Sequence, residues 1–112
     1  MSTYAYHGTT LKKLKRIRNN GLVPGAYSSY GDKYSIYDDG KHIFYSDDPN
    51  YIRGSYGDII IRFPWPIDST FDENVYGRTM FHQLVSKKKV SVKDIEVEFN
   101  GTWVSLDSIE IK

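Results

Sequence analysis

Tyrosine is the residue type that stands out in this 112-residue sequence as a possible source of binding chemistry. Ten tyrosines are present, and seven of them lie between Tyr27 and Tyr56. A phenol ring combines a flat face for stacking with a hydroxyl for hydrogen bonding, so this polar, aromatic-rich stretch predicts a binding cleft. His7 and Glu98 are two further residues whose types could do chemistry. Taken alone, a histidine at a strand end favours a structural role, and an acid on an edge strand favours solubility.

The elements that must position His7 are a strand and a helix at the start of the chain. Residues 3–6 are β-prone, and Gly8 is expected to end the strand. A threonine of the Thr9-Thr10 pair can cap a helix. Apolar residues then recur at helical spacing, at Leu11, Leu14 and Ile17. Asn19-Asn20-Gly21 predicts the end of this helix, and basic residues fill its outer face.

The middle of the chain predicts a long loop, two strands and a short helix. Residues 22–40 show no periodicity and predict a surface loop. Residues 42–45 indicate a short strand, and Asp48-Pro49 the cap and first residue of a helix that includes Tyr51 and Ile52. The continuous apolar run at 58–63 predicts a central strand, ended by the prolines that follow. A weak helical pattern follows, at Val75, Phe81, Leu84 and Val85.

The element that must position Glu98 is a C-terminal hairpin. Asn100-Gly101 between two apolar-alternating segments is a strong signal for a two-residue hairpin loop. This loop fixes the register, so that Phe99 faces Thr102 and Glu98 faces Trp103. The predicted core side consists of Ile95, Val97, Phe99, Val104 and Leu106. Ile109 and Ile111 indicate a final strand, and the whole chain predicts an α+β fold.

Composition excludes several classes of protein. The chain has no cysteine, which rules out disulfides and thiolate metal sites and fits a reducing, cytoplasmic compartment. No apolar run approaches the roughly 20 residues that cross a bilayer, so no membrane association is expected. Fifteen basic and fourteen acidic residues give a net charge of +1, without the strong global field of a dedicated duplex-DNA binder. No linker or repeat divides residues 1–112, which predicts a single domain.

Three separated motifs together resemble a known family. They are His7-Gly8-Thr9-Thr10 after a Tyr-rich strand, the segment from Gly40 to Asp47, and the late strand that carries Glu98. Their order resembles the His, aromatic and acid triad of ADP-ribosyltransferases, in the diphtheria-toxin-like branch that includes poly-ADP-ribose polymerases and RNA 2′-phosphotransferases. The stretch from Glu98 to Trp103 is also similar to small phage-borne anti-CRISPR ADP-ribosyltransferases. The resemblance implies a split, mostly antiparallel β-sheet with a few short helices.

The resemblance implies that the chain binds NAD as a substrate. His7 would hold ribose hydroxyls, Gly8 would bind the nicotinamide amide through its backbone, and Thr9 belongs to the same cofactor-binding motif. The cationic nicotinamide ring is attracted to an aromatic face, for which Phe44, Tyr45, Tyr51 and Tyr56 are the candidates. The family order of the two strand aromatics is exchanged here, so the choice between Phe44 and Tyr45 stays open.

The resemblance also assigns Glu98 as the catalytic acid, together with His7 and Tyr45. Loss of nicotinamide develops positive charge on the ribose, and hydrogen bonds to its 2-hydroxyl strengthen as this charge appears. A fixed carboxylate that accepts this hydroxyl would stabilise the transition state more than the ground state. Glu96 is the second choice, as an acid that orients the acceptor. No metal ion is required, and His42 and His82 have no partner at metal-ligand spacing.

The sequence therefore predicts an NAD-dependent mono-ADP-ribosyltransferase that modifies a host or partner protein, by analogy an anti-defence effector in the cytoplasm of a phage-infected cell. A nucleic acid acceptor is the other possibility. One alternative is a protein that keeps the fold without the chemistry and inhibits a partner by binding, since tyrosine is enriched at interfaces. RNA 2′-phosphate transfer ranks third, because most of the clustered positive charge falls on one predicted helix.

Overall fold

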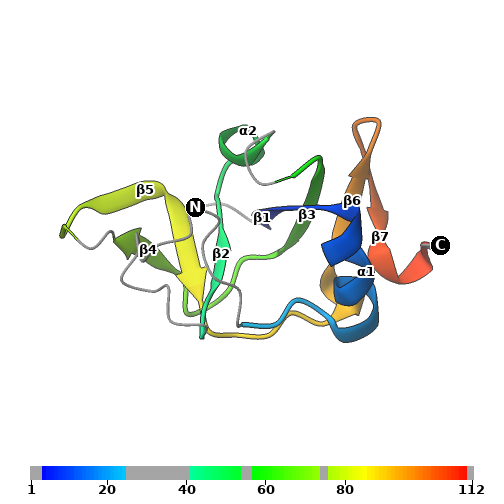
Figure 1. The fold of residues 1–112 in the computed structure, drawn as a ribbon, viewed down its shortest axis with the longest axis horizontal. Helices are drawn as coiled ribbons and strands as arrows, with labels where there is room; N and C mark the ends of the chain where they lie inside the picture. The colour runs from blue at the N-terminus through cyan, green and yellow to red at the C-terminus, as the bar shows by residue number, and fades with distance from the viewer. Residues whose placement is uncertain (1–3, 25–40, 54–56, 74–75, 111–112) are drawn as a thin grey trace.

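Two antiparallel sheets and two short helices make up the part of the chain that the computed structural model describes, which is residues 4–24, 41–53, 57–73 and 76–110 (Figure 1). The four-stranded sheet has the order β1 (Tyr4–Thr9), β3 (Ile59–Pro64), β6 (Glu96–Phe99), β7 (Thr102–Ser105). The three-stranded sheet has the order β2 (Ile43–Tyr45), β5 (Thr79–Ser86), β4 (Thr70–Glu73). The helices are α1 (Leu11–Asn20) and α2 (Pro49–Ile52), with short 3-10 turns η1 (Val92–Asp94) and η2 (Leu106–Ser108). The mixed α+β prediction is confirmed.

The first strand and helix follow the sequence signals, with one correction. Thr10 caps α1 by accepting a hydrogen bond from the Lys13 backbone at 3.3 Å. Gly21 ends α1, where its φ of 77° suits glycine. Gly8, however, does not end the strand. β1 continues through Gly8 to Thr9 because β3 provides backbone partners as far as Ile59.

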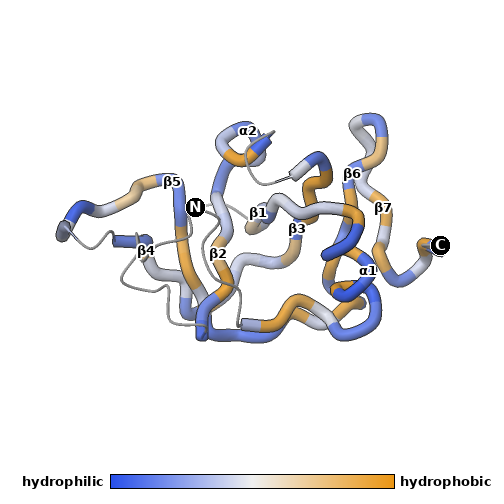
Figure 2. Tube along the Cα trace, viewed as in Figure 1, coloured by the Kyte–Doolittle hydropathy of each residue, from blue (hydrophilic) through white to orange (hydrophobic). Residues whose placement is uncertain are grey.

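The core lies on one face of the four-stranded sheet and extends to the three-stranded sheet. α1 covers this face with Leu14 and Ile17, while Leu11 stays 55% exposed. Figure 2 shows the apolar stretches of β2, β3 and β6 and the polar outer turns of α1. The cluster from the two sheets consists of Ala5, Ile43, Tyr45, Ile61, Phe63, Leu84 and Val97. None of the helices in the described segments has the length and apolarity needed to cross a bilayer.

The predicted helix around Phe81, Leu84 and Val85 is wrong, because this region forms the strands β4 and β5. Val75, the remaining residue of that pattern, lies outside the described residues. The register of β4 against β5 shifts between Phe71 and Asp72, so the period-two alternation of a strand is broken in the sequence. At the C-terminal end of β5, the successive residues Leu84 and Val85 are both buried. The alternation of buried and exposed residues expected of a strand is therefore absent there as well.

The C-terminal hairpin has the predicted register. Phe99 pairs with Thr102 and Glu98 with Trp103 across a turn in which Asn100 and Gly101 have φ angles of 49° and 80°. The prediction of Phe99 as a core residue is wrong, since its side chain is 47% exposed. β3 pairs only with Glu96 and Val97 of β6, so the tip of the hairpin extends past the core.

The prediction of a final strand at Ile109 is also wrong. After β7 the chain turns into η2, and Ile109 lies outside any strand. Ile111 lies outside the described residues. The turn buries Leu106 completely and closes with a hydrogen bond from the Ile109 backbone to the Leu106 carbonyl, 3.2 Å long.

Candidate functional site

In the described part of the chain, the two sheets meet at one backbone bridge, between Tyr6 of β1 and Ser46, the residue after β2. The Tyr6 amide donates to the Ser46 carbonyl at 2.9 Å, and the Ser46 amide donates to the Tyr6 carbonyl at 2.8 Å. Beyond this bridge β1 continues along β3, and β2 continues along β5. We refer to the place where they part, between Gly8 of β1 and Phe44 of β2, as the β1/β2 split. The two sheets lie toward opposite ends of the long axis of the molecule (Figure 1).

Gly8 directs its backbone polar groups into the β1/β2 split. In an antiparallel strand the N–H and C=O of one residue point to the same side, and the side alternates from one residue to the next. Tyr6 uses its groups to bind β2, so the groups of Gly8 also point toward β2. Phe44 is two residues before Ser46, and its groups point back toward β1 for the same reason. The N–H and C=O of Gly8 therefore face the split from β1, while the carbonyl of Phe44 faces it from β2 and is taken by the His7 side chain.

His7 spans the split with its side chain. Its Nδ1 lies 2.6 Å from the Phe44 carbonyl oxygen. Because a carbonyl oxygen only accepts hydrogen bonds, Nδ1 must carry the proton, and Nε2 is an acceptor in the neutral ring. Burial lowers the pKa of His7; the bond to Phe44 opposes this change, and the positive charge of Lys13 adds to it. His7 is thus held in the neutral form that leaves Nε2 able to accept a hydrogen bond.

The lowered pKa of His7 predicts a loss of stability in mild acid. Because the unfolded chain takes up a proton that the folded chain resists, the free energy of unfolding should fall as the pH decreases below about 6.5. His7→Asn retains a donor for the Phe44 carbonyl but does not titrate. Urea denaturation at about pH 7.5 and pH 5 should show a smaller loss for His7→Asn than for the wild type. Equal losses in the two proteins would exclude His7 as the group responsible.

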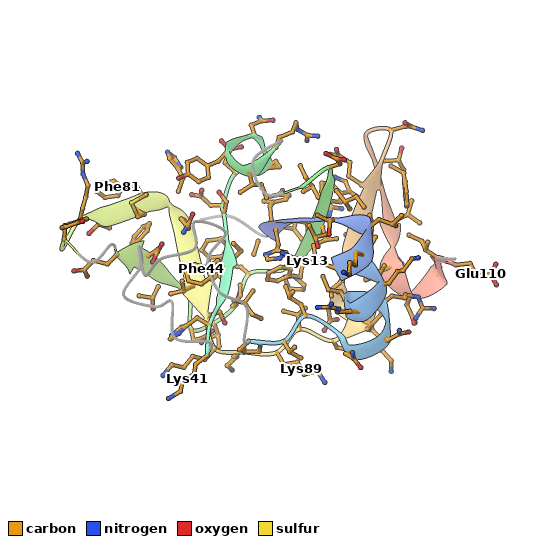
Figure 3. All side chains as sticks on the ribbon, viewed as in Figure 1. Lys13, Lys41, Phe44, Phe81, Lys89 and Glu110 are labelled. Carbon is orange, nitrogen blue, oxygen red and sulfur yellow. The ribbon has the colours of Figure 1, made fainter. Side chains whose placement is uncertain are left out.

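The two strand aromatics have different environments. Tyr45 is 2% exposed and packs edge-on against Phe63 and Trp65, with ring centroids 5.8 and 5.7 Å away. Its hydroxyl donates to Ser69 Oγ and lies 3.3 Å from the Val85 carbonyl oxygen, which shares the same proton, and burial raises its pKa to about 12. Tyr45 is therefore a core residue here and offers no free face for stacking. Phe44 points to the opposite face of β2 and is half-buried (Figure 3).

The other predicted binding residues lie around the split without converging on it. The side chain of Thr9 is buried, with its hydroxyl 3.5 Å from the Thr10 carbonyl. Tyr51 is on α2, which packs against β1. Its ring is 39% exposed and lies 5.5 Å from the ring of His82 on β5. His82 is in turn 3.5 Å from a carboxylate oxygen of Asp47. Tyr56 lies outside the described residues.

The register of the four-stranded sheet places His7 and Glu98 on opposite faces. Residues directly opposite each other on neighbouring strands share a face, and successive residues alternate. His7 is opposite Ile61, and Ile61 is opposite Val97. Glu98 follows Val97 and therefore faces the other way. The imidazole and the carboxylate that the sequence analysis expects in one cleft are not brought together.

Both acids of β6 are paired with arginines. Arg53 donates two hydrogen bonds to Glu98, at 2.7 and 3.1 Å, and these bonds are the main cause that lowers the pKa of Glu98. Arg62 donates to Glu96 at 2.8 Å. The guanidinium of Arg62 also lies 4.4 Å from the Trp103 ring centre. These contacts give Glu96 and Glu98 a structural explanation.

A buried carboxylate that the sequence analysis missed lies at the junction of β4 and β5. Asp72 is 2% exposed, accepts a hydrogen bond from the Gln83 side chain at 2.7 Å and accepts another from the Glu73 backbone at 2.9 Å. Nothing in the neighbouring sequence marks Asp72 as a buried residue. Its burial becomes apparent only when the pairing of β4 with β5 is known. Among the described residues, no three His, Asp or Glu side chains gather in a way that could hold a metal ion.

In comparisons with known proteins, the chain matches no family model, no curated protein and no solved structure. The candidate site is therefore interpreted from its own geometry. That geometry provides a backbone donor and acceptor at Gly8 and an imidazole acceptor at His7, with an aromatic side chain on Phe44 of the neighbouring strand.

Proposed function

We propose that this protein binds NAD with the nicotinamide end in the β1/β2 split, and that it is a mono-ADP-ribosyltransferase acting on a macromolecular acceptor. The observation that carries the proposal is the parting of β1 and β2 beside Gly8 and His7. In space, the strands follow the order β4-β5-β2 in one sheet and β1-β3-β6-β7 in the other, and a backbone bridge links β1 to the end of β2. This order supports a split sheet of the ADP-ribosyltransferase type.

The chemistry of the split fits the nicotinamide riboside part of NAD. The carboxamide of nicotinamide has one acceptor and two donor hydrogens, which complement the N–H and C=O of Gly8. The ribose hydroxyls are donors, and Nε2 of neutral His7 is a matching acceptor. The positively charged pyridine ring favours an aromatic neighbour, and Phe44 is the candidate with a half-buried rather than a buried side chain.

In the transfer, the bond between ribose C1′ and the nicotinamide nitrogen breaks, and its electron pair stays on nicotinamide. The acceptor oxygen or nitrogen forms the new bond to C1′ and releases its proton. His7 and Gly8 would hold the two parts on either side of the breaking bond. Glu98 has no direct part in this step, because it lies on the other face of the sheet in an ion pair with Arg53.

The position of Glu98 favours a second candidate function. A protein that binds NAD in the split without an acid near the ribose would occupy the site and react slowly or not at all. Such a protein would act on its partner by binding alone. Release of nicotinamide in the presence of a cell lysate as the source of acceptors distinguishes the transferase, which produces it, from the silent binder, which does not.

Calorimetric titration with NAD tests the binding site. Loss of a single hydrogen bond costs roughly 1.5 kcal/mol, which corresponds to about a tenfold change in Kd. His7→Asn, which lacks Nε2, should therefore raise the Kd for NAD about tenfold. Glu98→Gln is the control and should change the Kd by less than about twofold, because Glu98 does not face the split.

The opposite pattern, with Glu98→Gln weakening NAD binding and His7→Asn leaving it unchanged, would remove the split as the site. Failure of the wild-type protein to bind NAD at millimolar concentration would remove the proposed function itself.

A further inference from the structure

The positive charge of this nearly neutral chain is concentrated in two segments. Residues 11–22 contain five basic side chains and residues 86–93 contain four, and neither segment contains an acid. Nine of the fifteen basic residues are therefore in these two segments. Sixty-three residues separate the last residue of the first segment from the first residue of the second, so the sequence does not indicate that the two lie together.

The fold places these segments side by side. Leu22 and Val90 form a backbone bridge, with hydrogen bonds of 2.9 and 2.8 Å in the two directions. Gly21 packs against this bridge so closely that a Cβ there would lie 2.5 Å from the Val90 carbonyl oxygen and 3.5 Å from Cε of Lys89. α1 also contacts η1. Figure 3 shows Lys13 on α1 and Lys89 on the strand-like segment that runs below it.

Eight side chains form the resulting surface, which we name the basic face. They are Lys12, Lys13, Lys15, Arg16, Lys87, Lys88, Lys89 and Lys93, all of them exposed. Within the described segments, the ion pairs involve Arg18, Arg53, Arg62 and His82, and none involves a member of the basic face. Two acids lie close by: Asp94 follows Lys93 in η1, and Asp68 accepts hydrogen bonds from the Ser86 side chain and the Lys87 backbone and feels the charge of Lys88. The charges of the basic face are therefore available to a partner.

We propose that the basic face binds the phosphate backbone of a nucleic acid. Unpaired lysines on two adjacent segments are suited to a chain of phosphates, because each acts as a point charge and none requires a particular base. Neither segment, 11–22 or 86–93, contains an aromatic residue on which bases could stack, so binding through these segments is expected to depend on the backbone and not on sequence.

A protein partner fits this surface less well. The centre of a protein interface is depleted in charged residues, and lysine in particular is rare there. Leu11 is the exposed large apolar residue of the two segments, and Val23 follows the first of them, whereas Phe71 and Phe81 lie on the three-stranded sheet. The partner is therefore expected to be a polyanion rather than a folded protein surface.

The basic face also reaches the proposed NAD site. Lys13 is close enough for its charge to act on His7, and α1 begins two residues after Thr9, the end of β1. A nucleic acid on the basic face would thus pass beside the β1/β2 split. Binding of nucleic acid does not itself depend on NAD, so the two proposals can fail separately.

Fluorescence anisotropy with a labelled mixed-sequence RNA of roughly 20 nucleotides, without NAD, tests the basic face. The logarithm of the binding constant should fall linearly with the logarithm of the salt concentration, by roughly 0.7 for each phosphate contact. Lys12→Gln/Lys15→Gln and Lys88→Gln/Lys89→Gln each remove two charges from one segment. Each double variant should reduce the slope by about 1.4 and weaken binding about tenfold at low salt.

The control variant is Arg78→Gln/Thr102→Glu, which lowers the net charge by the same two units on exposed positions of the β4–β5 turn and the β6–β7 hairpin. It should leave the slope unchanged. The proposal is overturned if the control weakens binding as much as the two basic-face variants, or if only one of the two segments affects the slope. It is also overturned if poly-glutamate of equal charge binds as tightly as the RNA.

Discussion

Replacing Gly57 by alanine is expected to lower the free energy of unfolding by about 3–6 kcal/mol, because two penalties combine. Gly57 has a φ of 127°, a conformation that residues with a side chain rarely adopt. A Cβ at this position would also lie 2.1 Å from the Thr9 carbonyl oxygen. Thr9 cannot move away easily, since it is paired with Ile59 at the end of β1. Urea denaturation of the variant measures the loss.

Gly101→Ala is the matched control for Gly57→Ala. Gly101 also has a positive φ, 80°, but a Cβ there would meet nothing within 4 Å. Its loss should be limited to the backbone conformation, about 1–2 kcal/mol. A Gly57→Ala variant as stable as Gly101→Ala would contradict the close approach of Gly57 to Thr9.

Replacing Tyr45 by alanine is expected to lower the free energy of unfolding by about 3–5 kcal/mol, the usual cost of removing a buried aromatic ring. Tyr45→Phe keeps the ring beside Phe63 and Trp65 but leaves the Val85 carbonyl and Ser69 without their partner, for a smaller loss of about 1–2 kcal/mol. Thermal and urea denaturation measure both losses. Tyr51→Ala, on the exposed side of α2, is the control and should cost less than about 1 kcal/mol.

The same Tyr45 variants test whether this residue contacts NAD. Because its ring is enclosed in the core, Tyr45→Phe should change the Kd for NAD by less than about twofold. A Tyr45→Phe protein with wild-type stability and much weaker NAD binding would restore Tyr45 to the binding site and contradict the packing described above.

Local signals predicted the elements that depend on neighbouring residues. Asn100-Gly101 determines the turn and hence the register of β6 with β7, because both residues tolerate a positive φ. Thr10 and Gly21 mark the ends of α1, and Asp48 caps α2 through the Asn50 backbone at 2.9 Å. These predictions succeed because caps and tight turns are formed by residues that lie two to four positions apart.

The errors arose where the outcome depends on distant pairing. In β5, the successive residues Leu84 and Val85 are both buried, because β2 pairs with this strand on one side and β4 on the other. The register shift between β4 and β5 also masks the alternation of apolar and polar residues that marks a strand. The hairpin alternation correctly placed Glu98 away from Val97. Whether that side also faces His7 depends on β3, which aligns Ile61 with both His7 and Val97. No local pattern carries that information.

The outermost strands of the described sheets have a consequence for behaviour in concentrated solution. β4 carries two carboxylates, Asp72 and Glu73, at its shifted end, and β7 is only four residues long. Long, flat, uncharged borders promote intermolecular strand addition, and short, irregular or charged ones suppress it. The borders at β4 and β7 are therefore poor templates for strand addition, although Asp72 is itself buried and Phe71 and Phe81 lie exposed nearby.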